Sequence, residues 1–391
     1  MSNYPRVAFF TDSFHDVNGV AHTSRQLDSF ARRTGRPLLS VHAGPKTSWA
    51  DDTVELQRSE ARILLDDGLA FDPLLFRHMP LVERAVKQFK PDVIHITGPG
   101  DLGWLGLITH WRLGIPVVAS WHTNLHEYAA RRFPLPSIAQ PVQDICWQSL
   151  MLFYRIAERC LAPNEELRSL IQDQAKTPTA LMERGIDADL FTPARRQRSD
   201  DAVVLGYVGR LRPEKNVQML AEVEKAIRAA GLTNYRFLVV GDGSQREWLR
   251  HNLVQADLPG VLKGGPLADA YAAMDVFLFP STTDTYGNVI AEALASGVPA
   301  IVTSSGGPKF LVRDGETGFV AATGTQFAQR AVEMVAGQHP SAAMRTAARA
   351  WAEGRTWEAV FEGVWDCYRQ AAGASIAACP PRFAPASSKV R

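Results

Sequence analysis

Short runs of apolar, β-branched and aromatic residues alternate along this chain with longer segments whose apolar positions recur at helical spacing. Each short run predicts a buried strand, and each longer segment predicts a helix that covers one face of a sheet. In the first half we predict strands at 7–11, 38–42, 93–96, 117–121 and 160–162, and helices at 20–33, 81–89, 102–113 and 144–159. In the second half we predict strands at 203–208, 237–240, 260–263, 276–279 and 300–303, and helices at 217–230, 245–254, 267–273 and 288–296. This alternation predicts an α/β protein with a doubly wound parallel sheet in each half.

A polar, charged stretch at residues 194–201, Ala-Arg-Arg-Gln-Arg-Ser-Asp-Asp, separates the two halves and is typical of a linker. A chain of 391 residues is also longer than one hydrophobic core commonly supports. We therefore expect one domain at residues 1–192 and another at 200–355. A helix is expected at 356–373, and a disordered tail rich in Ala, Pro and Ser at 374–391.

The composition argues against several functional classes. The formal net charge is only +1, so nothing draws the chain to nucleic acid. No apolar run approaches the roughly 18 residues that span a bilayer, and no signal peptide precedes the first strand. The four cysteines, Cys146, Cys160, Cys367 and Cys379, have neither CxxC nor zinc spacing. We expect reduced thiols and a cytoplasmic location.

The most informative motif runs from Ser281 to Pro299, between two predicted strands. Asp284 and Glu292 stand eight residues apart in it, and Gly287-Asn288 begins the helix between them. A helix start offers backbone N–H groups and a positive dipole end to an anion such as phosphate. A carboxylate further along suits the hydroxyls of a ribose. The motif therefore predicts a pocket for a sugar nucleotide.

This stretch resembles the E-x7-E signature of the retaining glycosyltransferases of family 4, also called group 1, with Asp284 where the family usually has glutamate. The resemblance implies the GT-B fold, in which two Rossmann-like domains face each other across a cleft. The first domain would bind the acceptor and the second the donor, and the last helix would cross back to the first domain. The residues it implies for donor binding are Gly19, Arg210, Lys215, Lys263, Asp284, Tyr286, Gly287, Asn288, Val289 and Glu292.

Three further segments of the second half resemble motifs of this family. Arg210 and Lys215, in Gly-Arg-Leu-Arg-Pro-Glu-Lys-Asn, would bracket the diphosphate of the donor. Fixed cations stabilise the charge that develops on the leaving nucleoside diphosphate, so we expect no metal and no other cofactor. In Gly-Gly-Pro-Lys, Lys309 stands near the position of a common glutamate of the family. Lys263 would lie beside the base of the nucleotide.

In the first half, the loop Thr-Asp-Ser-Phe-His-Asp-Val-Asn-Gly at residues 11–19 resembles the family's glycine loop, and Gly19 would let the main chain approach the donor. His122, in Ser-Trp-His-Thr, would hydrogen-bond a hydroxyl of the donor sugar. The resemblance implies catalytic roles for His122, Arg210, Lys215 and Asp284. His122 and His126 stand four apart, but no third metal ligand accompanies them.

We interpret the chain as a retaining hexosyltransferase with GDP-mannose or a UDP-hexose as donor, and with mannosyl transfer leading. The motifs are most similar to those of mannosyl and sulfoquinovosyl transferases that act on lipids. The basic pair Arg131 and Arg132 belongs either to a contact with the inner membrane surface or to the inner wall of the acceptor domain. The alternatives are a soluble disaccharide or polysaccharide synthase that uses a UDP- or ADP-hexose, and a sugar-nucleotide-binding protein without turnover.

Overall fold

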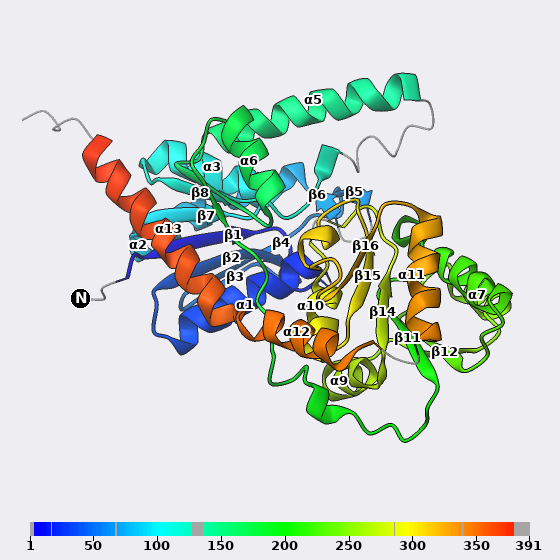
Figure 1. The fold of residues 1–391 in the computed structure, drawn as a ribbon. Coiled ribbons are helices and arrows are strands. Elements are labelled where there is room, and N and C mark those ends of the chain that lie inside the picture. Colours follow the sequence, from blue (N-terminus) through cyan, green and yellow to red (C-terminus); the bar gives the residue numbers. More distant parts are fainter. Residues whose placement is uncertain are drawn as a thin grey trace, which may run out of the picture. The chain divides into compact units, whose positions relative to one another are not determined.

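The computed structural model describes residues 4–16, 18–66, 69–126, 136–284, 286–337 and 340–378. The chain divides into two compact units. Unit 1 comprises Met1–Met182 and Phe361–Arg391, and unit 2 comprises Glu183–Val360. The division therefore falls earlier than the boundary that we expected at residue 192. Figure 1 labels the elements along the chain.

Unit 1 is built on an eight-stranded sheet with the order β10-β9-β8-β7-β1-β2-β4-β3. Its strands are β1 (Val7–Thr11), β2 (Leu38–Gly44), β3 (Ser48–Ala50), β4 (Thr53–Gln57), β7 (Val93–Ile96), β8 (Val117–Ser120), β9 (Arg159–Ala162) and β10 (Thr179–Leu181). All neighbouring strands in this sheet are parallel except β3, which pairs antiparallel with β4. A separate antiparallel hairpin consists of β5 (Ile63–Asp66) and β6 (Leu69–Phe71).

The helices of unit 1 are α1 (Gly19–Arg33), α2 (Met79–Phe89), α3 (Asp101–Leu113), α5 (Pro136–Arg155) and α6 (Glu165–Gln174), with a 3₁₀ turn η1 (Pro73–His78). The last helix, α13 (Trp357–Ala378), begins in unit 2 and belongs to unit 1 from Phe361 onward. Its aromatic residues pack on α1, where the rings of Phe361 and Trp365 lie 5.4 and 5.6 Å from that of Phe30. Burial of these rings fixes the helix to the unit.

Unit 2 has a six-stranded, entirely parallel sheet with the order β13-β12-β11-β14-β15-β16. Its strands are β11 (Val203–Val208), β12 (Tyr235–Val240), β13 (Ala256–Gly260), β14 (Val276–Phe279), β15 (Ala300–Thr303) and β16 (Gly318–Ala321). Its helices are α7 (Met219–Ala229), α8 (Arg246–Asn252), α9 (Gly264–Ala273), α10 (Asn288–Ala295), α11 (Gly324–Ala336) and α12 (Ala342–Glu353), and its 3₁₀ turns are η2 (Pro193–Arg195), η3 (Pro213–Lys215) and η4 (Pro308–Phe310).

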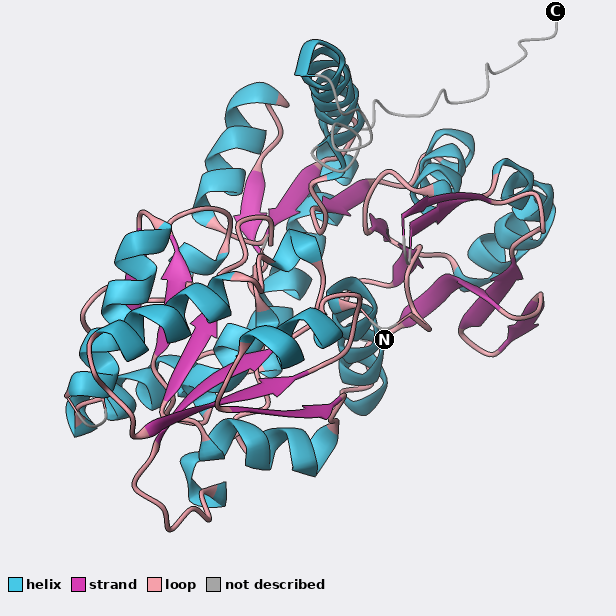
Figure 2. Cartoon of the chain, turned by 90° about the vertical axis from the view of Figure 1, so that its right-hand side faces the viewer, coloured by secondary structure: helices cyan, strands magenta, loops and turns pink. Residues whose placement is uncertain are grey.

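Helices flank both faces of the sheets, which confirms the prediction of doubly wound α/β architecture (Figures 1 and 2). Each unit has its own core. In unit 2 it includes the fully buried strand residues Val203–Val208, and in unit 1 the buried side chains of β1, β7 and β8. Such runs are apolar on both faces of the strand, as expected where helices cover both sides of a parallel sheet.

The structure differs from the sequence prediction in several elements. The strand predicted at 260–263 was wrong, because β13 ends at Gly260 and α9 begins at Gly264. Strands β3–β6, β10 and β16 and helices α6, α11 and α12 were not predicted. Helix α13 also continues to Ala378, through residues 374–378 that we expected to be disordered; these residues are rich in alanine, which favours a helix. Residues 379–391 lie outside the described part of the chain.

Candidate active site

The topological switch point of unit 2 lies between β11 and β14, because the sheet continues from these two strands in opposite directions. Doubly wound sheets bind ligands there, beyond the carboxyl ends of the strands. Lys215 belongs to the segment after β11, and Asp284 to the loop after β14. The Lys215 Nζ lies 2.7 Å from Asp284 Oδ1, with exposed side-chain fractions of 13% and 21%. The structure thus joins two of the predicted catalytic residues across the switch point.

The second carboxylate oxygen of Asp284, Oδ2, is buried and has no hydrogen-bond partner among the described residues. A buried acceptor without a donor is destabilising. A ligand hydroxyl that reached this carboxylate would remove that cost, while Lys215 continued to neutralise the charge. This unsatisfied oxygen is the clearest sign of a ligand in unit 2.

The helix that follows Asp284 begins where the sequence predicts an anion site. Gly287 adopts a φ of +101°, a conformation that favours glycine, and precedes the first helical residues Asn288 and Val289. The first N–H groups of a helix have no partner within it and lie at its positive end. Tyr286 is buried, and its hydroxyl donates to the carbonyl of Arg184 at 3.2 Å. Its side chain therefore supports the loop, and the predicted contact of Tyr286 with the donor stays a prediction.

Glu292, the matching carboxylate of the E-x7-E signature, lies one turn further along α10. Its Oε2 accepts a hydrogen bond of 2.7 Å from the hydroxyl of Tyr271 on α9. Burial raises the pKa of Glu292 to about 7, although the hydrogen bond from Tyr271 acts in the opposite direction. The two carboxylates of the signature therefore differ: Asp284 has a cation beside it, whereas Glu292 is neutral in part of the molecules near pH 7.

The Arg210 side chain is more exposed than that of Lys215 and has a longer ion-pair distance. Its side chain is 46% exposed and its Nη2 lies 3.9 Å from Glu214 Oε1, in the same loop. The Tyr207 hydroxyl donates to the Arg210 carbonyl at 3.1 Å and so ties the loop after β11 to the strand. The predicted contact of Arg210 with the donor diphosphate stays a prediction.

The glycine turns after β11 and β12 have a packing role. Gly209 and Gly241 adopt φ values of +155° and +140°. A Cβ on Gly241 would lie 1.9 Å from the carbonyl oxygen of Gly209, so no larger residue fits between the two turns. The Gly209 N–H also donates to the Val240 carbonyl at 3.0 Å. These glycines keep the carboxyl ends of β11 and β12 close together.

The other two lysines of unit 2 that the sequence places near the donor are Lys263 and Lys309. Lys263 is exposed and precedes α9, without a side-chain cap to that helix. Lys309 lies in η4, with its Nζ 4.9 Å from the ring centroid of Phe310. Their contacts with base and phosphate stay predictions.

In unit 1, the glycine loop ends at the start of α1. Asn18 caps this helix, because its Oδ1 accepts a hydrogen bond of 2.8 Å from the Ala21 N–H. Gly19 is the first helical residue and is exposed. Asn18 thus caps the helix that Gly19 begins. The approach of the Gly19 main chain to a donor stays a prediction.

His122 follows β8 and is 8% exposed. One of its nitrogens, Nε2, lies 2.7 Å from the Ser120 hydroxyl oxygen. His126, the other histidine of the pair, packs edge-on against the ring of Trp147 with centroids 4.8 Å apart, and burial lowers its pKa. Among the described residues, no group of three or more His, Cys, Asp or Glu side chains is arranged to hold a metal ion.

Sequence reasoning missed a charged cluster at the switch point of unit 1, which lies between β1 and β7. Asp12 follows β1, and Asp101 begins α3 after β7. Arg58 binds Asp101 through two nitrogens at 2.8 and 3.1 Å and lies 3.7 Å from Asp12. The signal was an aspartate directly after a strand and another in the first turn of a helix, but only the sheet order joins them.

The pKa values of the two carboxyl groups of this cluster are shifted in opposite directions. Burial and the neighbouring Asp101 carboxyl raise the pKa of Asp12 well above its usual range. Burial opposes ionisation of Asp101 too, but hydrogen bonds from Asp12 and Arg58 outweigh it and lower the Asp101 pKa. Asp12 therefore holds a proton more readily than Asp101 does, and Arg58 lies beside the carboxylate that ionises more readily.

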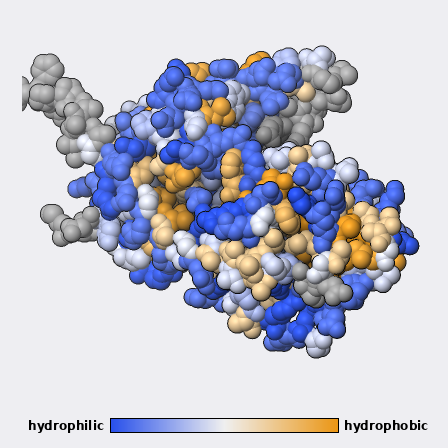
Figure 3. Space-filling view, viewed as in Figure 1, coloured by the Kyte–Doolittle hydropathy of each residue, from blue (hydrophilic) through white to orange (hydrophobic). Residues whose placement is uncertain are grey.

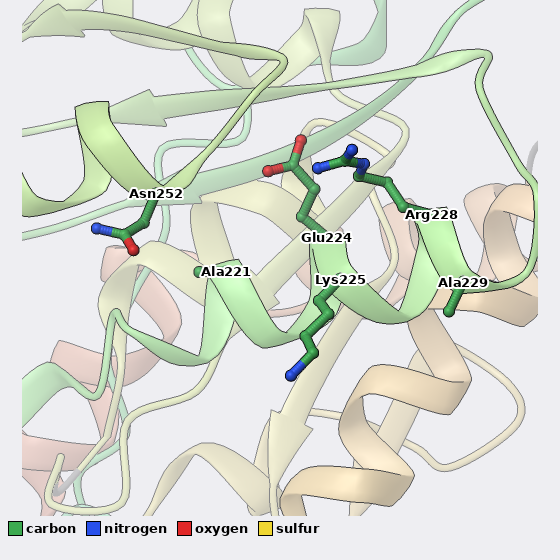
Figure 4. Close-up of a pocket in the computed structure, with 6 residues that line it drawn as sticks. All are labelled: Ala221, Glu224, Lys225, Arg228, Ala229 and Asn252. Atoms are coloured by element: carbon green, nitrogen blue, oxygen red, sulfur yellow. The ribbon is translucent and has the colours of Figure 1, made fainter.

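A surface hollow on unit 2 is lined by residues of α7 and by Asn252 at the end of α8 (Figure 4). Glu224, which lines it, accepts hydrogen bonds from the Tyr235 hydroxyl and from the N–H groups of Val254 and Gln255 at 2.8–3.1 Å. Its hydrogen bonds thus tie α7 to the sheet and to the loop before β13. The hollow carries no sign of the predicted chemistry.

None of the described helices has the length and apolar character to cross a membrane. On the face drawn in Figure 3, hydrophobic patches are interrupted throughout by hydrophilic surface. The basic pair Arg131 and Arg132, on which the predicted membrane contact rested, lies outside the described residues.

Two family models match the chain. Residues 54–189 match Glycosyltransferase Family 4, and residues 202–337 match Glycosyl transferases group 1. The second match contains the segments of Lys215, Asp284 and Glu292. The first contains His122 and most of the sheet of unit 1.

Individual proteins agree with these matches. The chain is 32% identical over 389 residues to a GDP-mannose-dependent alpha-mannosyltransferase of Mycobacterium tuberculosis, covering 94% of this chain and 97% of that protein. It is 29% identical to a sulfoquinovosyl transferase of Arabidopsis thaliana, over 63% of this chain and 50% of that protein. A sucrose-phosphate synthase structure from Thermosynechococcus elongatus has the same GT-B fold, with a TM-score of 0.72, 19% identity, and coverage of 94% of this chain and 100% of that one. The chain thus belongs to the group 1 glycosyltransferases of family 4 and is a hexosyltransferase.

Proposed function

We propose that this enzyme transfers mannose from GDP-mannose to an acceptor hydroxyl with retention of the anomeric configuration. The observation that carries the proposal is the ion pair of Lys215 and Asp284 at the switch point, with one buried Asp284 oxygen that no described residue satisfies. Such a pair offers a cation to phosphate and an acceptor to a sugar hydroxyl in one place. The relative named as GDP-mannose-dependent supports mannose and guanine in particular.

In this proposal unit 2 holds the nucleotide. Lys215 and Arg210 contact the diphosphate, together with the backbone N–H groups at the start of α10. Glu292 accepts hydrogen bonds from the ribose hydroxyls, and Asp284 accepts one from the sugar. His122 of unit 1 hydrogen-bonds a hydroxyl of the same sugar.

The chemistry is a substitution at the anomeric carbon. The bond from that carbon to the phosphate oxygen breaks, and GDP leaves with the bonding electrons. The acceptor oxygen forms its bond on the same face, and its proton passes to the departing phosphate oxygen. Lys215 and the α10 start act by stabilising the negative charge that grows on the diphosphate. No side chain is needed as a base on the opposite face.

For the acceptor we propose a lipid hydroxyl. The resemblance to lipid-modifying transferases favours a lipid hydroxyl and contact with the inner membrane surface. Vesicle flotation with anionic lipid, compared with neutral lipid, measures that contact directly. A protein that stays at the bottom of the gradient with both lipids contradicts it.

Thermal unfolding with GDP, UDP and ADP tests the donor, because a ligand of the native state raises the midpoint. We expect GDP to raise it most. NMR of the product from GDP-mannose and an acceptor alcohol then gives the anomeric configuration, expected to be α. Stabilisation by UDP or ADP alone would favour the disaccharide or polysaccharide synthase. Binding without transfer to any acceptor would favour a protein that only binds sugar nucleotides.

A further inference from the structure

A continuous chain of buried polar side chains ends at His122. The Tyr368 hydroxyl of α13 lies 2.6 Å from His95 Nδ1 on β7. The opposite nitrogen, His95 Nε2, lies 2.9 Å from the hydroxyl oxygen of Ser120, which ends β8. The same oxygen lies 2.7 Å from His122 Nε2. Tyr368, His95 and Ser120 are fully buried, and His122 is 8% exposed.

His95 is neutral in this chain. Burial lowers its pKa to about 3, and the ring of Phe9 packs against it with centroids 5.1 Å apart. A neutral imidazole carries one N–H donor and one acceptor nitrogen. His95 therefore donates to one neighbour and accepts from the other, so the direction of one hydrogen bond determines the direction of the next.

The phenol of Tyr368 sets that direction. Among the described residues its hydroxyl has no hydrogen-bond partner other than His95, and a buried donor without an acceptor is destabilising. The hydroxyl therefore donates to Nδ1, and His95 Nε2–H donates to the Ser120 oxygen. The Ser120 proton then goes to His122 Nε2 at 2.7 Å, in preference to the Ile96 carbonyl at 3.4 Å.

We propose that Tyr368, His95 and Ser120 are positioning residues that hold His122 as the tautomer with an acceptor Nε2 and the proton on Nδ1. In this tautomer the Nδ1–H of His122 is a hydrogen-bond donor, and the hydrogen bond between Nε2 and Ser120 fixes the orientation of the ring. If His122 binds a sugar hydroxyl, as the proposed function has it, its Nδ1–H donates to the oxygen of that hydroxyl. The fixed tautomer therefore favours hydroxyl groups that can accept a hydrogen bond. The tautomer of His122 is thus set by a residue of α13, in the part of that helix that belongs to unit 1.

Nitrogen-15 NMR of histidine-labelled protein tests the assignment, because protonated and unprotonated ring nitrogens have well separated shifts. His122→Gln identifies the signals of His122. In the wild type we expect a protonated Nδ1 and an unprotonated Nε2. Tyr368→Phe removes only the hydroxyl that sets the direction, so we expect the His122 signals to move toward a mixture of tautomers. With the donor identified, kcat should fall about tenfold in this variant while the donor KM stays within about twofold.

Tyr154→Phe is the matched control. Tyr154 is also buried, and its hydroxyl lies 3.4 Å from the backbone carbonyl oxygen of Ser120. It does not belong to the series of side-chain hydrogen bonds that ends at His122. We expect it to leave the His122 tautomer and kcat unchanged. A tautomer change of equal size in both variants would indicate general loosening of the fold and would contradict the proposal.

The wild-type spectrum keeps the test decisive even if Tyr368→Phe does not fold. A wild-type His122 with its proton on Nε2 overturns the proposal without any variant. An unchanged tautomer in a folded Tyr368→Phe protein overturns it as well. Because the NMR signal needs no turnover, failure of hexosyl transfer would reject the proposed function and leave the tautomer result standing on its own.

Discussion

The switch points of the two units use charge in opposite ways. In unit 2, Lys215 and Asp284 meet at 2.7 Å, and one Asp284 oxygen has no hydrogen-bond partner in the part of the chain that the structure describes. In unit 1, Asp12, Asp101 and Arg58 satisfy one another, and Asp101 also accepts from the Asp72 N–H at 3.1 Å. The same location in the same kind of sheet thus holds an incomplete polar site in one unit and a complete one in the other. Incomplete sites indicate ligands, whereas complete ones indicate structural support.

The comparison predicts where a mutation affects activity and where it affects stability. The largest effect on activity is expected for Lys215→Ala. Loss of a charge-assisted contact in the transition state costs on the order of 2–4 kcal/mol, so kcat should fall about 30- to 1000-fold. Initial rates at saturating donor measure it. We expect Arg210→Ala to lower kcat as well.

Lys225→Ala is the matched control for Lys215→Ala, because Lys225 is an exposed lysine on α7 of the same unit. We expect wild-type kcat in the control and a native thermal midpoint in both variants. Wild-type turnover in Lys215→Ala would contradict its assignment to the leaving-group site.

In unit 1 the main effect is expected on stability. Asp101→Ala removes a fully buried carboxylate and leaves the Arg58 guanidinium, 15% exposed, without its principal partner. Breaking a buried ion pair from one side costs about 3–5 kcal/mol in the free energy of unfolding. Urea denaturation measures this loss, and calorimetry on the folded variant should give unchanged donor affinity. A stable Asp101→Ala protein with weakened donor binding would reverse the comparison.

The carboxylates of unit 2 should differ in their pH dependence. The Glu292 pKa of about 7 lies above the ordinary value of 4.5, so the folded apo protein binds the extra proton more tightly than the unfolded chain does. That contribution to stability is complete below pH 4.5 and is lost as the pH rises toward 7. In the proposed complex the ribose hydroxyls bind the ionised carboxylate, so donor affinity should rise with pH, at most tenfold per unit, and level off above about 7.

Calorimetry at several pH values checks this dependence, and Glu292→Gln should abolish it. We also expect Glu292→Gln to weaken nucleotide binding more than Asp284→Asn, since Glu292 matches the family residue. Equal losses in the two variants, or a pH dependence that persists in Glu292→Gln, would count against this ranking.

The smallest expected effect is that of chelation. In the proposed complex, Lys215 and the start of α10 supply positive charge for the leaving diphosphate, so a divalent ion would be redundant there. Rates before and after EDTA should agree. Activity that disappears with EDTA and returns with Mg²⁺ or Mn²⁺ would show that the cations of unit 2 are insufficient.

Local patterns in the sequence were enough for the α/β alternation and for the principal motifs. A buried strand such as β11 is apolar along its whole length, and the start of α10 is marked by Gly287, so these elements need no knowledge of the rest of the chain. Two of the short strands were not predicted, because their local sequence pattern does not mark them. β3 and β16 have three and four residues, and their pairing with neighbouring strands, rather than their own pattern, makes them strands.

Which residues meet was decided by the tertiary structure. Motif spacing identified Lys215 and Asp284, but only the sheet order brings their loops together across 69 residues of sequence. Tyr368 and His95 are 273 residues apart, and neither pattern nor motif connects α13 with β7. The unsatisfied oxygen of Asp284 and the raised pKa of Glu292 also depend on burial. Sequence determines local periodicity and local chemistry, whereas desolvation and long-range contacts exist only once the chain is folded.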